Sequence, residues 1–132
     1  RYKNPPASRD IIFNELYVNW DEDLIIVEGV FDAIKAGNAI PLLGSTLRES
    51  SSLFQAVVKS GCKVFLALDA DAAKKTRNIG RLLLRYGVEV HEIDTTGVED
   101  VGSMSKMEFQ SRKDNAAIVE KDNYLLQRLS AI

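Results

Sequence analysis

Apolar runs alternate with amphipathic segments along most of the chain. Residues 24–27 are a continuous run of leucine and β-branched residues, typical of a strand buried on both faces. Residues 39–43 and 63–68 predict two further strands, and Pro41 fits the first of these only near a sheet edge or where its nitrogen has no ladder partner. Residues 88–93 alternate between apolar and polar and predict a strand at the sheet edge. Helical repeats lie between these runs, in residues 30–36, in a segment that Gly61 ends, and in residues 72–86. This order predicts an α/β fold: a parallel sheet of about four strands, flanked by helices and joined by right-handed crossovers.

The pattern changes after Ile93. Residues 94–103 form a polar, glycine-containing segment, and a short helix is predicted to end near Phe109. Residues 111–115 predict a second polar break. A last helix is predicted over residues 116–129, with apolar residues that can pack back on the domain.

Acidic residues follow two of the predicted buried strands. Glu28 comes directly after residues 24–27, and Asp69 and Asp71 come after residues 63–68. Ligands of open parallel sheets bind beyond the carboxyl ends of the strands, so these acids are expected to meet there. Carboxylate oxygens are the ligands that Mg²⁺ prefers, so the sequence predicts a divalent-metal site. The alternative is that these acids only end strands and cap helices.

Three ordered motifs around these acids resemble a known family. The segments Glu28-Gly29-Val30-Phe31-Asp32, Leu42-Leu43-Gly44-Ser45-Thr46 and Asp69-Ala70-Asp71-Ala72-Ala73 resemble the signatures of the Toprim domain of bacterial and phage DNA primases. The resemblance runs from about Asp23 to about Phe109 and implies a Rossmann-like fold. It divides the chain into a lead-in over residues 1–22, a Toprim domain over 23–110 and a C-terminal helical extension over 111–132.

The resemblance assigns roles to individual residues. Glu28 matches the glutamate that acts as a general base or acid, and Asp69 and Asp71 match the pair that binds Mg²⁺ or Mn²⁺. Asp100 is the candidate for the other half of the metal site. In the lead-in, Arg1, Tyr2 and Asn4 match residues that approach the catalytic centre. The supporting positions are Gly29, Asp32, Gly44, Ser45 and Thr46, and Asp32 has the alternative role of an acid at a helix start.

The chain departs from the family pattern at two places. Lys74 replaces the glycine that follows the Asp-x-Asp motif. The family's Lys-Asp-Pro-Asp is represented by Glu99-Asp100-Val101-Gly102, so Gly102 stands where a second aspartate is expected. One potential metal ligand is therefore missing, which leaves the number of bound metals open.

The predicted helix after Asp71 carries a basic stripe. Lys74, Arg77, Arg81 and Arg85 recur at spacings of three and four and share one helix face. The first three are candidates for binding nucleic acid or nucleotides, because they lie closest to the proposed metal site. The alternative is an ordinary solvated helix face.

Composition narrows the class of protein. The chain has 132 residues, enough for one domain, and a net charge of −2, which by itself does not indicate a nucleic-acid binder. With one cysteine and one histidine, an internal disulfide is excluded and a zinc site is disfavoured. The sequence shows no membrane span or signal peptide, so we expect a cytoplasmic protein without a membrane partner. Because it begins with Arg1, we expect a piece of a longer chain.

The resemblance implies that the whole enzyme makes RNA primers by metal-dependent nucleotidyl transfer. Its partners would be a single-stranded DNA template, ribonucleoside triphosphates and, through regions outside this chain, a replicative helicase. The isolated chain is expected to be inactive in priming. Two alternatives remain: phosphodiester cleavage of the nuclease or topoisomerase type, and a non-catalytic Toprim module that binds nucleic acid.

Overall fold

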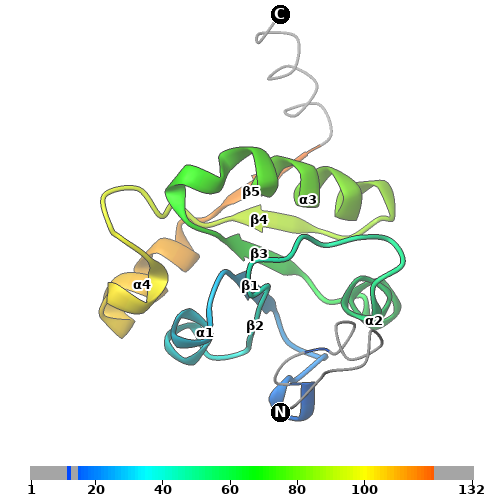
Figure 1. Cartoon of the computed structure of the whole chain (residues 1–132), viewed down its shortest axis with the longest axis horizontal. Helices are drawn as coiled ribbons and strands as arrows, with labels where there is room; N and C mark the ends of the chain where they lie inside the picture. The colour runs from blue at the N-terminus through cyan, green and yellow to red at the C-terminus, as the bar shows by residue number, and fades with distance from the viewer. Residues whose placement is uncertain (1–11, 13–14, 121–132) are drawn as a thin grey trace, which may run out of the picture.

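A computed structural model describes residue 12 and residues 15–120. Its central feature is a five-stranded sheet in the order β2-β1-β3-β4-β5 (Figure 1). The strands are β1 (Leu24–Val27), β2 (Ala39–Pro41), β3 (Val64–Ala67), β4 (Val90–Glu92) and β5 (Ala117–Val119). The first four are parallel, and β5 is antiparallel to β4. The predicted α/β class, with a parallel sheet flanked by helices, is confirmed.

Helices cover both faces of the sheet. On one face α1 (Val30–Ala36) and α4 (Lys106–Asp114) pack, and on the other α2 (Ser52–Ser60) and α3 (Ala73–Arg85) (Figure 1). Three short 3₁₀ turns complete the described elements: η2 (Glu15–Tyr17), η3 (Ala70–Ala72) and η4 (Val101–Ser103). No helix within the described residues is long and apolar enough to span a membrane.

The middle of the sheet explains the apolar runs in the sequence. Every residue of β1 and of β3 is buried, because each strand has helices on both of its faces. Alternate residues of β1 enter the two separate cores: Ile26 packs with α2 and α3, and Ile25 packs with α1 and α4. At the edge, β2 accommodates Pro41, as predicted for a residue without a backbone N–H.

The C-terminal part differs from the prediction. The break expected at residues 111–115 is wrong over most of its length, because α4 continues to Asp114, supported by an Arg112–Glu108 ion pair of 3.0 Å. The helix expected from residue 116 is wrong at Ala117–Val119, which form β5 and pair with β4. Strand β4 is therefore not an edge strand. The rest of that expected helix, residues 121–129, lies outside the described residues, and residue 111, the expected start of the extension, lies inside α4.

A buried carboxylate fixes α1 against the segment that follows β4. Asp32 is only 7% exposed. Its Oδ2 accepts a hydrogen bond from the Gly29 N–H at 3.0 Å, and its Oδ1 accepts one from the Gly102 N–H at 2.7 Å. A Cβ atom at Gly102 would lie 3.1 Å from that Oδ1, so a glycine allows this close approach. Asp32 is thus an acid in the first turn of a helix, which is the alternative role expected for it. It also links α1 to the segment that contains Gly102.

Replacing Asp32 with alanine should destabilise the domain strongly. Two N–H groups would lose a charged acceptor in a buried setting, which costs about 2–4 kcal/mol of unfolding free energy. Urea denaturation of Asp32→Ala would measure the loss, with the exposed Asp21→Ala as the control that removes the same charge. Equal stabilities of the two variants would contradict the structural role of Asp32.

Candidate functional site

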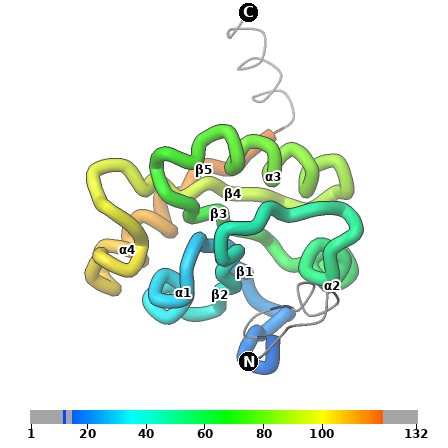
Figure 2. The backbone as a smooth tube through the Cα atoms, in the orientation of Figure 1, coloured from blue at the N-terminus to red at the C-terminus, as the bar shows by residue number. Residues whose placement is uncertain are grey.

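The parallel pairing of β1 and β3 brings the predicted acids to one edge of the sheet. Val27 and Ala67, the last residues of the two strands, are aligned in register. Glu28 follows Val27 directly, and Asp69 follows Ala67 after one further residue, Leu68. Figure 2 shows the chain leaving β1, β3 and β4 on the same side of the sheet. Glu28 and Asp69 therefore lie at the same carboxyl edge of the sheet, as predicted.

Glu28 has a partner that the sequence patterns did not indicate. The Lys75 ammonium on the first turns of α3 lies 2.9 Å from Glu28 Oε1. The two side chains are only 23% and 21% exposed, respectively. Lys75 does not belong to the predicted basic stripe, because it is offset from Lys74 by one position and so points in a different direction from the helix axis.

The electrostatic setting of Asp69 shows that several acids gather here. Partial burial raises the pKa of the Asp69 carboxyl above the ordinary aspartate value, and the negative charges of four neighbouring carboxylates raise it further. Like charges disfavour the ionised form, so the group carries mutual repulsion at neutral pH. We call these five residues the acidic cluster: Glu28, Asp32, Asp69, Asp71 and Asp100.

The members of the acidic cluster differ in how they are held. Asp69 precedes η3, but its side chain makes no capping hydrogen bond, and Asp71 is exposed within that turn. Asp100 caps η4, where its Oδ1 accepts a hydrogen bond from the Ser103 N–H at 2.9 Å. Asp32 has both oxygens bonded to backbone N–H groups. Within residues 12 and 15–120, Asp69 and Asp71 are therefore the members whose side chains form no hydrogen bond or ion pair. Asp100 has a capping role besides its expected one.

The oxygen donors of the acidic cluster suit a hard divalent ion whose coordination is completed by water or phosphate. Among the described residues, no three His, Cys, Asp or Glu side chains lie close enough together to hold a metal ion. Magnesium is usually bound through one or two carboxylates, with water and substrate phosphates as its other ligands. Asp69 and Asp71 fit that mode of binding, whereas a metal cage made entirely of protein groups does not fit.

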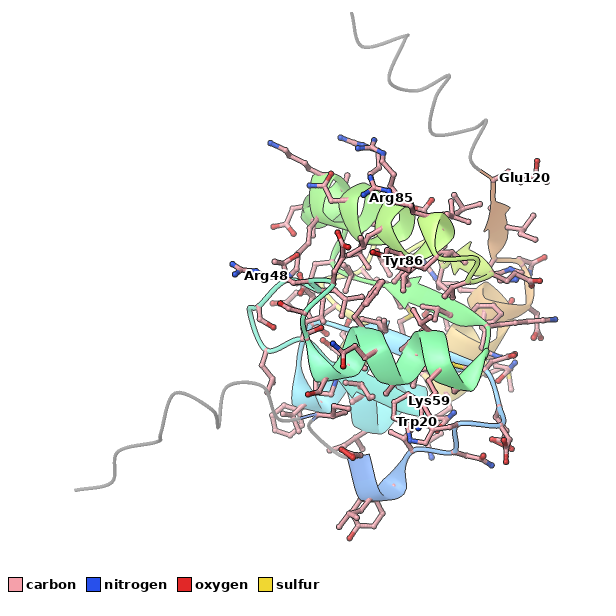
Figure 3. All side chains as sticks on the ribbon, turned by 90° about the vertical axis from the view of Figure 1, so that its right-hand side faces the viewer. Trp20, Arg48, Lys59, Arg85, Tyr86 and Glu120 are labelled. Atoms are coloured by element: carbon pink, nitrogen blue, oxygen red, sulfur yellow. The ribbon has the colours of Figure 1, made fainter. Side chains whose placement is uncertain are left out.

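A cleft opens beside the acidic cluster, between α3 and the residues that follow β4. Its volume is about 840 Å³. Asp69 lies at its wall, and Lys74, Arg77 and Arg81 from the predicted basic stripe line it as well. Arg85 is not among its lining residues; it is exposed at the end of α3, next to Tyr86, on the side seen in Figure 3. The stripe therefore divides into three residues at the cleft and one outside it.

Residues that the sequence analysis did not single out build the opposite wall. The buried Thr95 hydroxyl donates a hydrogen bond to the Leu68 carbonyl at 2.7 Å and so joins the exit of β4 to that of β3. Arg112 of α4 donates to the carbonyls of Asp94 and Thr96 at 2.7 and 2.9 Å. These contacts connect segments far apart in sequence, and no local pattern indicates them.

The segment after β2 lies beside Glu28. The Leu43 N–H donates to the Glu28 carbonyl at 2.9 Å, and Leu43 and Gly44 have positive φ angles of 55° and 83°. A turn with two such residues favours glycine, so Gly44 has a conformational reason to be there. Ser45 and Thr46 are exposed beyond the turn. Gly29 has extended backbone angles that any residue can adopt, and Arg1, Tyr2 and Asn4 lie outside the described residues.

Comparison with known proteins identifies the fold. No family profile matches the chain, and no curated protein matches it by sequence. Among solved structures it is similar to a crystal structure of the Aquifex aeolicus primase that contains the zinc-binding and RNA polymerase domains. The match has a TM-score of 0.62 and 24% sequence identity, and it covers 74% of this chain and 26% of that one. The chain thus has a fold found in that primase and spans about a quarter of its length.

The electrostatics of Asp69 give a stability prediction with a definite sign. An acid whose pKa is raised by folding favours the folded state below its unfolded pKa, and this contribution disappears as the pH rises through the folded pKa. In chelator at neutral pH, Asp69→Asn should therefore melt at the same temperature as the parent domain or higher. The difference should shrink as the pH falls to the ordinary range of aspartate titration.

A structural role for Asp69 predicts the opposite sign. Loss of a helix cap or ion pair would cost about 0.5–2 kcal/mol. Asp100→Ala removes a side chain that does cap a turn, so it is the positive control and should lower the melting temperature. A clear loss of stability in Asp69→Asn would contradict the placement of Asp69 in a self-repelling cluster.

Proposed function

We propose that this chain is the catalytic Toprim subdomain of a DNA primase. The observation that supports this best is the acidic cluster at the carboxyl edge of β1 and β3, with a cleft lined by cationic residues directly beside it. A polymerase that joins nucleotides needs both features, because it holds metal ions next to phosphates. The fold shared with a bacterial primase supports the same assignment.

In this proposal each group has a distinct task. Asp69 and Asp71 provide carboxylate oxygens for Mg²⁺ or Mn²⁺, and Asp100 lies near enough to contribute to the same negative field. When bound, the metal would lower the pKa of an attacking 3′-hydroxyl and neutralise charge on the leaving pyrophosphate. Glu28 would accept or return the proton, and Lys74 and Arg77 would bind phosphates of the template or nucleotide.

The substrates of the whole enzyme would be ribonucleoside triphosphates and a single-stranded DNA template. Template binding would need surfaces outside this chain, because its net charge is −2 and the cleft is lined by the acids Asp69, Glu92 and Asp94 as well as by its three cations. A replicative helicase would likewise contact regions outside this chain. We therefore expect residues 1–132 alone to bind single-stranded DNA weakly and to make no primers.

A second function is favoured by one observation in the η4 segment. Gly102 stands where the family pattern has an acid, and its N–H group is already bonded to Asp32. This arrangement also suits a Toprim module that binds nucleic acid without catalysis. In the catalytic proposal Asp69 is needed for RNA synthesis, whereas in the binding-module proposal it is not.

Replacement of Asp69 in the primase that contains this chain tests the two proposals against each other. If the chain is catalytic, Asp69→Ala should reduce templated RNA synthesis by roughly 100-fold or more, the scale of losing a group that stabilises transition-state charge. Binding of single-stranded DNA should stay close to that of the parent protein. Unchanged synthesis would contradict the catalytic role and favour the binding module.

Metal binding can be tested directly on the isolated chain. In NMR spectra, substoichiometric Mn²⁺ should broaden the amide signals of residues 69–72 first, because a paramagnetic ion held by Asp69 and Asp71 lies closest to them. Binding should be weak without substrate, since phosphates supply missing ligands. An Asp69→Asn/Asp71→Asn double variant is the control and should lose this broadening. Broadening confined to other surface acids would contradict the assignment.

The division of the basic stripe gives a matched pair of substitutions. Removing one phosphate contact should lower the slope of log affinity against log salt for single-stranded DNA by about 0.7. We expect this for Arg77→Ala, which opens onto the cleft, and not for Arg85→Ala, about 12 Å further along the helix. Fluorescence anisotropy over a salt series measures both. Equal slopes for the two variants would assign the stripe to a solvated face.

A further inference from the structure

The Lys75–Glu28 ion pair joins α3 to the end of β1 at the centre of the proposed site. The Nζ–Oε1 distance is 2.9 Å, and about three quarters or more of each side chain is shielded from water. Charged pairs shielded in this way interact more strongly than surface pairs, because water and salt screen them less. Glu28 is therefore held in one direction by a cation that belongs to the protein itself.

This pair is distinctive among the charges of the acidic cluster. Of the ion pairs formed between described residues, it alone involves a carboxylate of that cluster. The adjacent Lys74 makes no ion pair with a described residue and lines the cleft instead. Two consecutive lysines thus face different surroundings: Lys74 faces the cleft beside Asp69, and Lys75 faces Glu28.

A bound divalent ion and the Lys75 ammonium would compete for the negative charge of the Glu28 carboxylate. Glu28 follows Val27 and Asp69 comes two positions after Ala67, and Val27 and Ala67 are paired in register, so a cation near Asp69 also attracts Glu28. If the carboxylate turns toward such an ion, its 2.9 Å contact between Oε1 and Nζ would lengthen or break. Release of Glu28 would leave an ammonium beside the site, where an anionic phosphate is a suitable new partner.

We propose that Lys75 is a positioning residue that holds Glu28 in the metal-free domain and gives it up when a divalent ion binds. The inference rests on the proposed function only in assuming a metal site at the acidic cluster. Its consequence is that Lys75 lowers the affinity for metal in the absence of substrate. The site would then bind metal firmly only together with the phosphates that complete it.

Mn²⁺ titrations of the 132-residue chain, followed by the electron paramagnetic resonance signal of free Mn²⁺, test this. Lys75→Met should bind Mn²⁺ roughly tenfold more tightly than the parent chain, because a competing unit charge a few ångströms away is removed. Lys74→Met removes the same charge from an exposed neighbour and should have a smaller effect, since water and salt screen it. Lys75→Arg keeps the cation and should resemble the parent.

A double-mutant cycle shows whether Glu28 is the group through which Lys75 acts. In a Glu28→Gln background, Lys75→Met should no longer increase the affinity beyond the effect of Lys74→Met in that background. Melting in chelator gives a second measurement: Lys75→Met should be less stable than the parent, and saturating Mn²⁺ should remove the difference. If Lys75→Met does not fold, Lys75→Gln carries the same test with a neutral polar side chain.

The possible failures are distinguishable. Equal Mn²⁺ affinities of Lys75→Met and Lys74→Met, or weaker binding by Lys75→Met than by the parent, would overturn the role of Lys75 and leave the metal site intact. Absence of Mn²⁺ binding by all variants would overturn both the inference and the metal site. Templated synthesis by the primase that contains this chain remains a separate test of the proposed function.

Discussion

The parallel pairing of β1 with β3 is the constraint on which the rest of the site depends. Both strands are fully buried, and their last residues are in register, so the chain must leave them at the same edge of the sheet. Any side chains that follow these strands are brought within electrostatic range of each other. Here those side chains are carboxylates, and their mutual repulsion is opposed by the hydrophobic burial of the strands that precede them.

The domain limits this repulsion by giving some of the acids internal partners. Two backbone N–H donors stabilise the charge of Asp32, and the Ser103 N–H stabilises that of Asp100. The Lys75 ammonium offsets the charge of Glu28. Asp69 and Asp71 have no such partner in the part of the chain that the structure describes. An external cation can therefore bind mainly the carboxylate oxygens of Asp69 and Asp71. Both residues lie where the chain passes from β3 into α3.

The same crossovers decide where the positive charge lies. Helix α3 begins beside the acidic cluster and runs back along the sheet, so its first turns face the cleft and its last turn does not. The opposite wall is fixed by Thr95 and by Arg112, which binds two carbonyls of the segment after β4. The cleft is thus formed by three separate parts of the chain, each held by its own hydrogen bonds.

The sequence by itself determined the α/β class, the four parallel strands and the acids at their ends. These features follow from local composition, because a run such as Leu24–Val27 can be buried only in the middle of a sheet. It did not determine β5, since three residues followed by a helical repeat carry too little pattern to predict a strand. Nor did it indicate that Lys75 rather than Lys74 contacts Glu28, that Asp32 bonds to Gly102, or that Arg85 lies outside the cleft. The two contacts join residues 47 and 70 positions apart, and the place of Arg85 depends on the direction of α3, so only the tertiary packing of the sheet and its crossovers decides them.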